Sequence, residues 1–281
     1  MTFTFFTFGG CQLWEDVFFS SKWRIQRNCL TKHYRLLDNW NIRRASGTYE
    51  ECSRAFNRYA KVFQLPLHKS RAVIMLHGLT GYKEQFNKIA QMCEAQNMTA
   101  ISLNYPSTRK SMKSHVRQLS FFMDNLKNVN EVCFITKGIG GLIIRKLLST
   151  DGKWKKRIKI SKVIQINPIN QGYALWECFS QSKFITFLFG ELLSYGKKEN
   201  AKKIPTFPSS IEFGIINTNN RLWNAIRSIL PKKLDKFLFK MSDSFLPNAS
   251  DIKYIQTWRI NQLNSKKLIL FCKNFLRCGK F

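Results

Sequence analysis

Acidic residues are scarce in this chain. Its 281 residues include 17 aspartates and glutamates against 46 lysines and arginines, a formal net charge of +29 at pH 7. An excess of this size indicates a polyanionic partner, such as nucleic acid or an anionic membrane, when the basic residues share one face. Here they are spread along the chain, with modest clusters at 109–113, 153–162, 197–203 and 266–280. We interpret the charge as compositional bias and expect no nucleic-acid partner; an anionic partner is the alternative.

Long apolar runs are also missing. No stretch of about 18 consecutive apolar residues occurs, the length that a membrane-spanning helix needs, so we expect no transmembrane segment. The apolar residues 1–8 lack the basic segment that opens a signal peptide, and secretion is not predicted.

Metal-binding cysteine patterns are absent. The eight cysteines form no Cys-x-x-Cys pair and no Cys/His cluster at zinc spacing, so we predict no metal site and no cofactor. Cys93 and Cys133 fall inside a predicted helix and a predicted strand, where free thiols pack as small apolar residues. Free thiols favour a reducing compartment, and we expect a cytoplasmic protein.

The composition that remains, 44% apolar and 22% charged, is typical of a folded globular protein. Residues 1–69 are predicted to form an N-terminal extension. Up to about residue 50, aromatic and basic residues mix without a clean period, so we predict irregular structure there. Cys52, Phe56, Tyr59 and Phe63 then recur at helical spacing and predict an amphipathic helix over 49–63.

From residue 70 the pattern becomes regular, because short apolar runs alternate with amphipathic segments. The runs lie at 72–76, 99–103, 132–136 and 163–166, and the predicted helices at 83–96, 112–127 and 142–149. Strands that are apolar on both faces and alternate with helices indicate a mostly parallel sheet covered on both sides. The sequence therefore predicts a three-layer α/β domain over 70–281.

Three motifs in the α/β part give a resemblance to a known superfamily. Val73–Leu79 resembles the strand and His-Gly turn that supplies part of an oxyanion hole. Phe134–Gly141 resembles the nucleophile elbow, and Asn167–Gly172 the Pro-x-x-Gly-type loop after the next strand. Together they resemble the α/β-hydrolase fold, in particular its small esterase/lipase-like branch.

The resemblance implies an oxyanion hole at His77, Leu79 and Ile139, where the amides of Leu79 and Ile139 would be the donors. It also implies a small helical cap at about 173–205. This segment is rich in aromatic residues: Trp176, Phe179, Phe184, Phe187 and Phe189. Such a cap can cover the core, line a cleft for a small acyl or ester ligand, or contact a membrane surface peripherally. Covering the core is the interpretation we favour.

The catalytic triad that the resemblance requires is degenerate. Gly138 stands at the serine position of the elbow, and no histidine follows His115. The triad-equivalent acid is Asp235, and the family's histidine aligns near Arg259. A guanidinium stays protonated near neutral pH, so Arg259 cannot act as a general base.

The sequence therefore predicts a protein of esterase/lipase-like ancestry that is catalytically inactive. One alternative is an active carboxylic-ester hydrolase with a rearranged site, using His77 as the base and a serine that the sequence does not place. Another is a basic binding protein for anionic lipid or nucleic acid.

Overall fold

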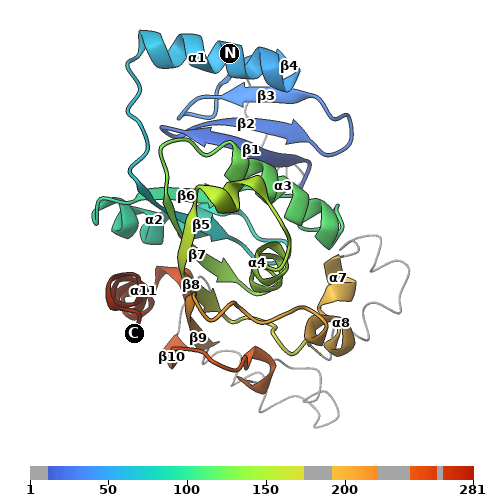
Figure 1. The fold of residues 1–281 in the computed structure, drawn as a ribbon, viewed down its shortest axis with the longest axis vertical. Helices are drawn as coiled ribbons and strands as arrows, with labels where there is room; N and C mark the ends of the chain where they lie inside the picture. Colours follow the sequence, from blue (N-terminus) through green and yellow to red (C-terminus); the bar gives the residue numbers. More distant parts are fainter. Residues whose placement is uncertain (1–11, 174–191, 221–240, 258–261) are drawn as a thin grey trace.

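A six-stranded parallel sheet forms the centre of the computed structural model, which describes residues 12–173, 192–220, 241–257 and 262–281 (Figure 1). The strand order is β10-β9-β8-β7-β5-β6, and every neighbouring pair is parallel. The strands are β5 Arg71–Leu76, β6 Thr99–Leu103, β7 Glu131–Lys137, β8 Lys159–Ile166, β9 Glu212–Asn220 and β10 Asp251–Thr257. The four predicted strands each lie within one of these, which confirms the α/β class with its parallel sheet.

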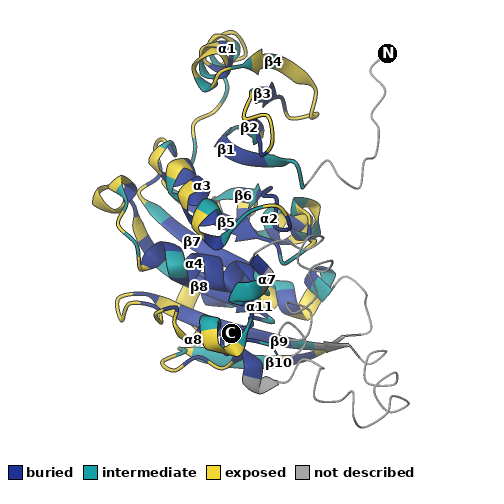
Figure 2. Cartoon of the chain, turned by 90° about the vertical axis from the view of Figure 1, so that its right-hand side faces the viewer, coloured by how far each residue is buried: buried dark blue, intermediate teal, exposed yellow. Residues whose placement is uncertain are grey.

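Helices cover both faces of this sheet. On one face α3 (Met112–Asp124) and α4 (Gly140–Leu148) pack in a cluster that includes Ile74 of β5. On the other face α2 (Asn87–Glu94) and α11 (Lys266–Cys278) pack in a cluster that includes Val73 and Met75. Adjacent β5 residues thus point into two different cores, and the central strands are buried on both sides (Figure 2).

The remaining helical elements are short. They are η1 Lys83–Phe86, η2 Lys153–Lys156, α7 Leu192–Tyr195, α8 Lys198–Lys202, η3 Met241–Ser244 and η4 Gln262–Asn264. The helix predicted over 83–96 is therefore divided into a 3-10 turn and α2.

Cys93 and Cys133 are fully buried free thiols, as predicted. Burial raises the pKa of the Cys93 thiol to about 12, because the thiolate would lose its hydration.

The irregular structure predicted before residue 50 is wrong. These residues form a four-stranded antiparallel sheet in the order β1-β2-β3-β4. Its strands are β1 Trp14–Ser20, β2 Trp23–Asn28, β3 Tyr34–Leu37 and β4 Arg43–Gly47. Helix α1 (Tyr49–Val62) follows where a helix was predicted and covers one face, with Phe56 beside Trp23 and Ile25.

Strand β2 alternates apolar and polar residues over Trp23–Gln26, although the aromatic and basic residues around it show no clean period. The strand is buried on both faces, with Ile25 under α1 and Gln26 on the opposite side. Gln26 is satisfied there by hydrogen bonding, because its amide donates to Asp16 Oδ1 at 2.8 Å and its oxygen accepts from Arg35. The face of β2 opposite α1 is therefore polar although it is buried.

The N-terminal sheet is joined to the α/β domain by buried hydrogen bonds at the end of β6. The amide of Asp16 donates to the Asn104 carbonyl at 2.9 Å, and the amide of Asn104 donates to Asp16 Oδ2 at 2.7 Å. Gln118 of α3 donates to the Asp16 carbonyl at 2.9 Å. Asp16, Asn104 and Gln118, which we call the seam, fix β1 against β6 and α3.

Helix α1 begins with a capping box. Thr48 Oγ1 accepts from the amide of Glu51 at 3.2 Å, and Glu51 Oε2 accepts from the amide of Thr48 at 2.8 Å. We expect Thr48→Ala to lower the free energy of unfolding by about 1 kcal/mol, because the amide of Glu51 loses the hydroxyl that caps it. Urea unfolding measures this, and Thr48→Ser should retain wild-type stability. An alanine variant as stable as the wild type would contradict the capping role.

Candidate functional site

The turn between β7 and α4 has the backbone geometry of a nucleophile elbow. Gly138 has φ +53°, the left-handed region that glycine enters without strain. Its amide donates to the Ile166 carbonyl at 3.0 Å, and its carbonyl accepts from the amide of Gly141 at 3.1 Å. A Cβ added at Gly138 would meet, among the described residues, only Gly78 Cα at 3.9 Å, an ordinary contact. The position therefore has room for a side chain but carries no nucleophile.

Gly140, unlike Gly138, has no room for a side chain. A Cβ added there would lie 3.1 Å from the carbonyl oxygens of both Leu76 and His77. Glycine therefore lets the start of α4 approach the end of β5. This close packing holds the elbow against the turn that follows β5.

That turn, His77–Gly81, is where the sequence predicts an oxyanion hole. The amide of Gly81 donates to the Gly78 carbonyl at 3.0 Å, and the amide of Thr80 donates to Ser107 Oγ at 3.1 Å. Within the described part of the chain, the amides of Leu79 and Ile139 make no hydrogen bond. The turn and the elbow thus adjoin, and the oxyanion hole at Leu79 and Ile139 stays a prediction.

His77 is enclosed beneath this turn. Its ring is fully buried and stacks on Tyr105, with centroids 4.2 Å apart and planes at 10°. Nδ1 donates to the Gly78 carbonyl at 2.8 Å, and Nε2 has no partner among the described residues. Burial lowers the pKa of His77 to about 4, because the charged imidazolium would lose its hydration. A neutral ring without solvent access suits a structural role in the turn better than that of a general base.

His115 of α3 lies on the other side of Tyr105. The two rings meet edge to face with centroids 5.1 Å apart. Burial lowers the pKa of His115 to about 3, and the nearby Lys110 ammonium acts in the same direction. His77, Tyr105 and His115 form one buried aromatic stack, which contains two neutral imidazoles.

This stack makes stability depend on pH. Both histidines bind a proton at their usual pKa of 6.5 when the chain unfolds, but not in the folded state. The unfolded state therefore binds more protons below pH 6.5, and the free energy of unfolding falls as the pH is lowered toward 4. At about pH 5.5 we expect a loss of about 1.4 kcal/mol for each imidazole.

Urea unfolding between about pH 7.5 and about pH 5 tests this dependence. His115→Leu should flatten the curve, because it removes one of the two buried imidazoles. Equal slopes for the wild type and His115→Leu would exclude His115 as a source.

Two polar neighbours of the elbow do not supply a nucleophile. Thr136 is buried in β7, and its hydroxyl donates to the Ile164 carbonyl at 3.4 Å. Lys137 extends along the turn, with its Cγ 4.0 Å from a Cβ placed on Gly78, and burial lowers the pKa of its amine. Lys137 could act as a general base only if residue 138 carried a hydroxyl, and Gly138 has none.

A buried guanidinium anchors α4 behind the elbow. Arg145 is 2% exposed and donates through Nε to the Pro205 carbonyl at 3.0 Å and through Nη2 to the Ile204 carbonyl. Its Nη1 reaches the carbonyl and the side-chain oxygen of Asn170 at 3.2 and 3.3 Å. Burial lowers the pKa of Arg145 to about 10, because the charged guanidinium loses its hydration. Arg145 thus fastens the loop at 167–172 and the segment at 204–205 to the elbow helix; sequence reasoning missed it.

Other predicted site residues lie outside the described residues. They are Asp235, Arg259 and the cap segment 174–191 with its five aromatic residues, so their convergence on Gly138 stays a prediction. In the described ranges no group of three histidines, cysteines or carboxylates could hold a metal ion, and no helix is long and apolar enough to span a membrane.

A parallel six-stranded sheet with the glycine-rich turn after β7 and the His-Gly turn after β5 has the features of the α/β-hydrolase fold. Comparison with solved structures agrees. The chain is similar to a lipase from Bacillus licheniformis in its mature form, with a TM-score of 0.55 at 12% identity, over 75% of this chain and 92% of the lipase. This likeness shows the fold alone, and it confirms the predicted α/β-hydrolase fold.

Two further solved structures are similar to the chain with lower TM-scores. A gene product of Listeria innocua gives a TM-score of 0.48 at 14% identity, over 75% of this chain and 96% of that one. A metagenomic carboxyl esterase gives 0.46 at 13% identity, over 69% and 66%. No protein-family model and no curated protein sequence matches the chain.

Proposed function

We propose that this chain is an α/β-hydrolase-fold protein of esterase/lipase-like ancestry that no longer catalyses hydrolysis. The observation that carries the proposal is Gly138: the elbow has its geometry and its open space, but no hydroxyl. Acyl transfer on this fold needs an attacking oxygen before any base or oxyanion donor can act.

The histidines support the same conclusion. All four lie in the described part of the chain, and none is placed to serve the elbow as a base. His77 and His115 are buried in the aromatic stack. His33 contacts Trp14, and Nε2 of His68 lies 2.9 Å from the Phe19 carbonyl, both at the N-terminal sheet. A serine hydrolase needs an imidazole within hydrogen-bond reach of its nucleophile.

The amides of Leu79 and Ile139 give the inactive site a remaining capacity. Preorganised donors of this kind bind a carbonyl or carboxylate oxygen without any nucleophile. We propose that the site binds a small acyl or ester ligand, whose oxygen accepts from these two amides. Protein in the cytoplasm would meet such ligands as soluble esters or at a membrane surface.

Hydrolysis of p-nitrophenyl acetate, butyrate and octanoate by the purified chain tests the loss of activity. We expect no rate above buffer and no labelling by a fluorophosphonate probe. Saturable hydrolysis, or labelling of any serine, would contradict the proposal. If His77→Ala then abolished that activity with the fold intact, the rearranged-site alternative would replace it.

A further inference from the structure

A cavity lies apart from the elbow, between the N-terminal sheet and α3. It has a volume of about 860 Å³ and is lined by strands β1–β3, the β2–β3 turn, the loop that follows β6, and α3. None of its lining residues belongs to the turn at 77–81 or to the elbow. We call this cavity the basic cleft. Its size lies within the range of sites for small organic ligands.

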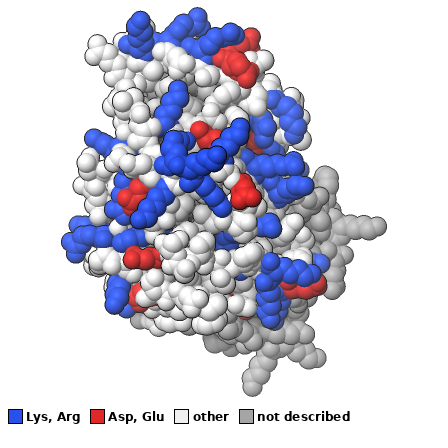
Figure 3. Space-filling view, viewed as in Figure 1, with Lys and Arg blue, Asp and Glu red and all other residues white. Residues whose placement is uncertain are grey.

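Five basic side chains line the cleft, and the described residues contribute no carboxylate to its lining. They are Arg27, Lys32, Arg109, Lys110 and Arg117. Figure 3 shows lysine and arginine side chains gathered where the N-terminal sheet meets α3. Arg109 and Arg117 are exposed and form no ion pair within the described ranges. The positive charge of the cleft is thus far from neutralised by the protein itself.

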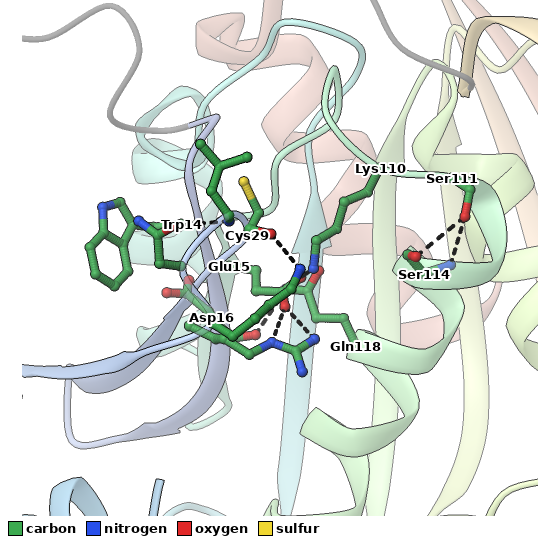
Figure 4. A network of polar contacts seen from close by, with 12 residues as sticks. Trp14, Glu15, Asp16, Cys29, Lys110, Ser111, Ser114 and Gln118 are labelled. Carbon is green, nitrogen blue, oxygen red and sulfur yellow. Dashed lines mark hydrogen bonds and ion pairs between the residues drawn. The ribbon is translucent and has the colours of Figure 1, made fainter. Parts of the chain in front are cut away.

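A buried carboxylate behind the wall holds two of these cations in place. Glu15 is fully buried, pairs with Arg27, and accepts from Lys110 Nζ at 2.6 Å (Figure 4). A carboxylate that bridges two cations from distant parts of the chain fixes both side chains at little further entropy cost. The single negative charge of Glu15 leaves most of the positive charge of the five basic side chains unbalanced, and two of these side chains are held in fixed positions.

The N-terminus of α3 opens into the same cleft. Ser111 caps the helix by accepting from the amide of Ser114 at 3.3 Å, and both serines line the cavity (Figure 4). The first turn of this 13-residue helix contains no acidic residue, so nothing in that turn offsets its positive dipole end. Backbone and side chains therefore favour an anion at the same place.

We propose that the basic cleft binds a small organic ligand that carries two or more phosphate groups. About three to four negative charges, which two phosphates supply, match the excess left after Glu15. Arginine forms the paired hydrogen bonds that suit phosphate oxygens. Tyr34 and Phe121 in the lining offer aromatic surface to the organic part of the ligand.

Titration calorimetry of the full chain with sodium tripolyphosphate and with ATP tests the site. We expect saturable binding of one equivalent, with ATP tighter because its base contacts aromatic surface. Arg109→Gln/Arg117→Gln should weaken both probes by about tenfold or more, since two charged donors to the phosphate oxygens are lost. Lys273→Gln/Arg277→Gln removes the same charge from exposed positions on α11, across the central sheet, and should change binding by less than about twofold.

The two double variants distinguish specific binding in the basic cleft from nonspecific attraction of anions to a positively charged protein. Equal weakening in both double variants, or no binding of either probe by the wild type, would overturn the proposal. Circular dichroism and the melting temperature confirm that each variant is folded.

Vesicles of phosphatidylcholine with phosphatidylinositol bisphosphate then identify the source of the phosphate. Sedimentation that needs Arg109 and Arg117 and is reversed by tripolyphosphate assigns a lipid head group. Binding of the soluble probes without sedimentation assigns a soluble phosphate ester. Both results support the site.

Discussion

Gly138→Ser/Arg259→His is expected to hydrolyse short acyl esters about 100-fold faster than Gly138→Ser alone, the lower end of what a positioned general base contributes. The structure supports the first substitution, because the only described atom within 4 Å of a Cβ at position 138 is Gly78 Cα, at 3.9 Å. The free amides of Leu79 and Ile139 would stabilise the oxyanion. The second substitution follows the predicted alignment of position 259 with the family's histidine.

Single variants separate the contributions. Gly138→Ser alone should stay near the wild-type rate, because its hydroxyl has no base. Gly138→Ala carries the same Cβ in the left-handed region, so both should lose about 1–3 kcal/mol of stability relative to glycine. A double variant that is folded but silent would show that position 259 does not face the elbow.

Arg145→Met is expected to give the largest loss of stability, about 3–5 kcal/mol. The guanidinium donates to four oxygens in the interior, and methionine would leave the carbonyls of Asn170, Ile204 and Pro205 without this donor. Thermal unfolding should show a fall of about 2–4 °C for each kcal/mol.

Lys146→Met is the matched control, since Lys146 is the next residue of α4, is only partly buried, and makes no side-chain hydrogen bond in the described ranges. It should melt within about 2 °C of the wild type. If Arg145→Met melted with it, the buried contacts of the guanidinium would be neutral in balance, as some buried charges are.

The sequence predicted those parts of the fold that depend on local pattern. The run at 99–103 became β6 with the same bounds, and the elbow and the His-Gly turn meet as the resemblance required. Such features depend on the period of apolar residues and on glycine positions, which neighbours in sequence reveal.

Contacts between residues that are far apart in the sequence could not be predicted from it. Glu15 and Lys110 are 95 residues apart in the sequence, and Arg145 and Pro205 are 60 apart. A local pattern of apolar residues cannot predict contacts at such separations. The cluster at 109–113 was visible as charge, but its place in a cleft depends on β2 and on the β2–β3 turn. The positions of Asp235 and Arg259 stay predictions.

The seam at Asp16, Asn104 and Gln118 bears on how the chain comes apart. Separating the two sheets would exchange several buried hydrogen bonds for bonds to water at once, at a net cost of about 0.5–1.5 kcal/mol each. The N-terminal sheet and the α/β domain are therefore expected to melt in one cooperative transition. A fragment that starts at residue 70 would expose the backbone groups at the end of β6 that now bond to β1. Other chains could pair with this exposed edge of the sheet.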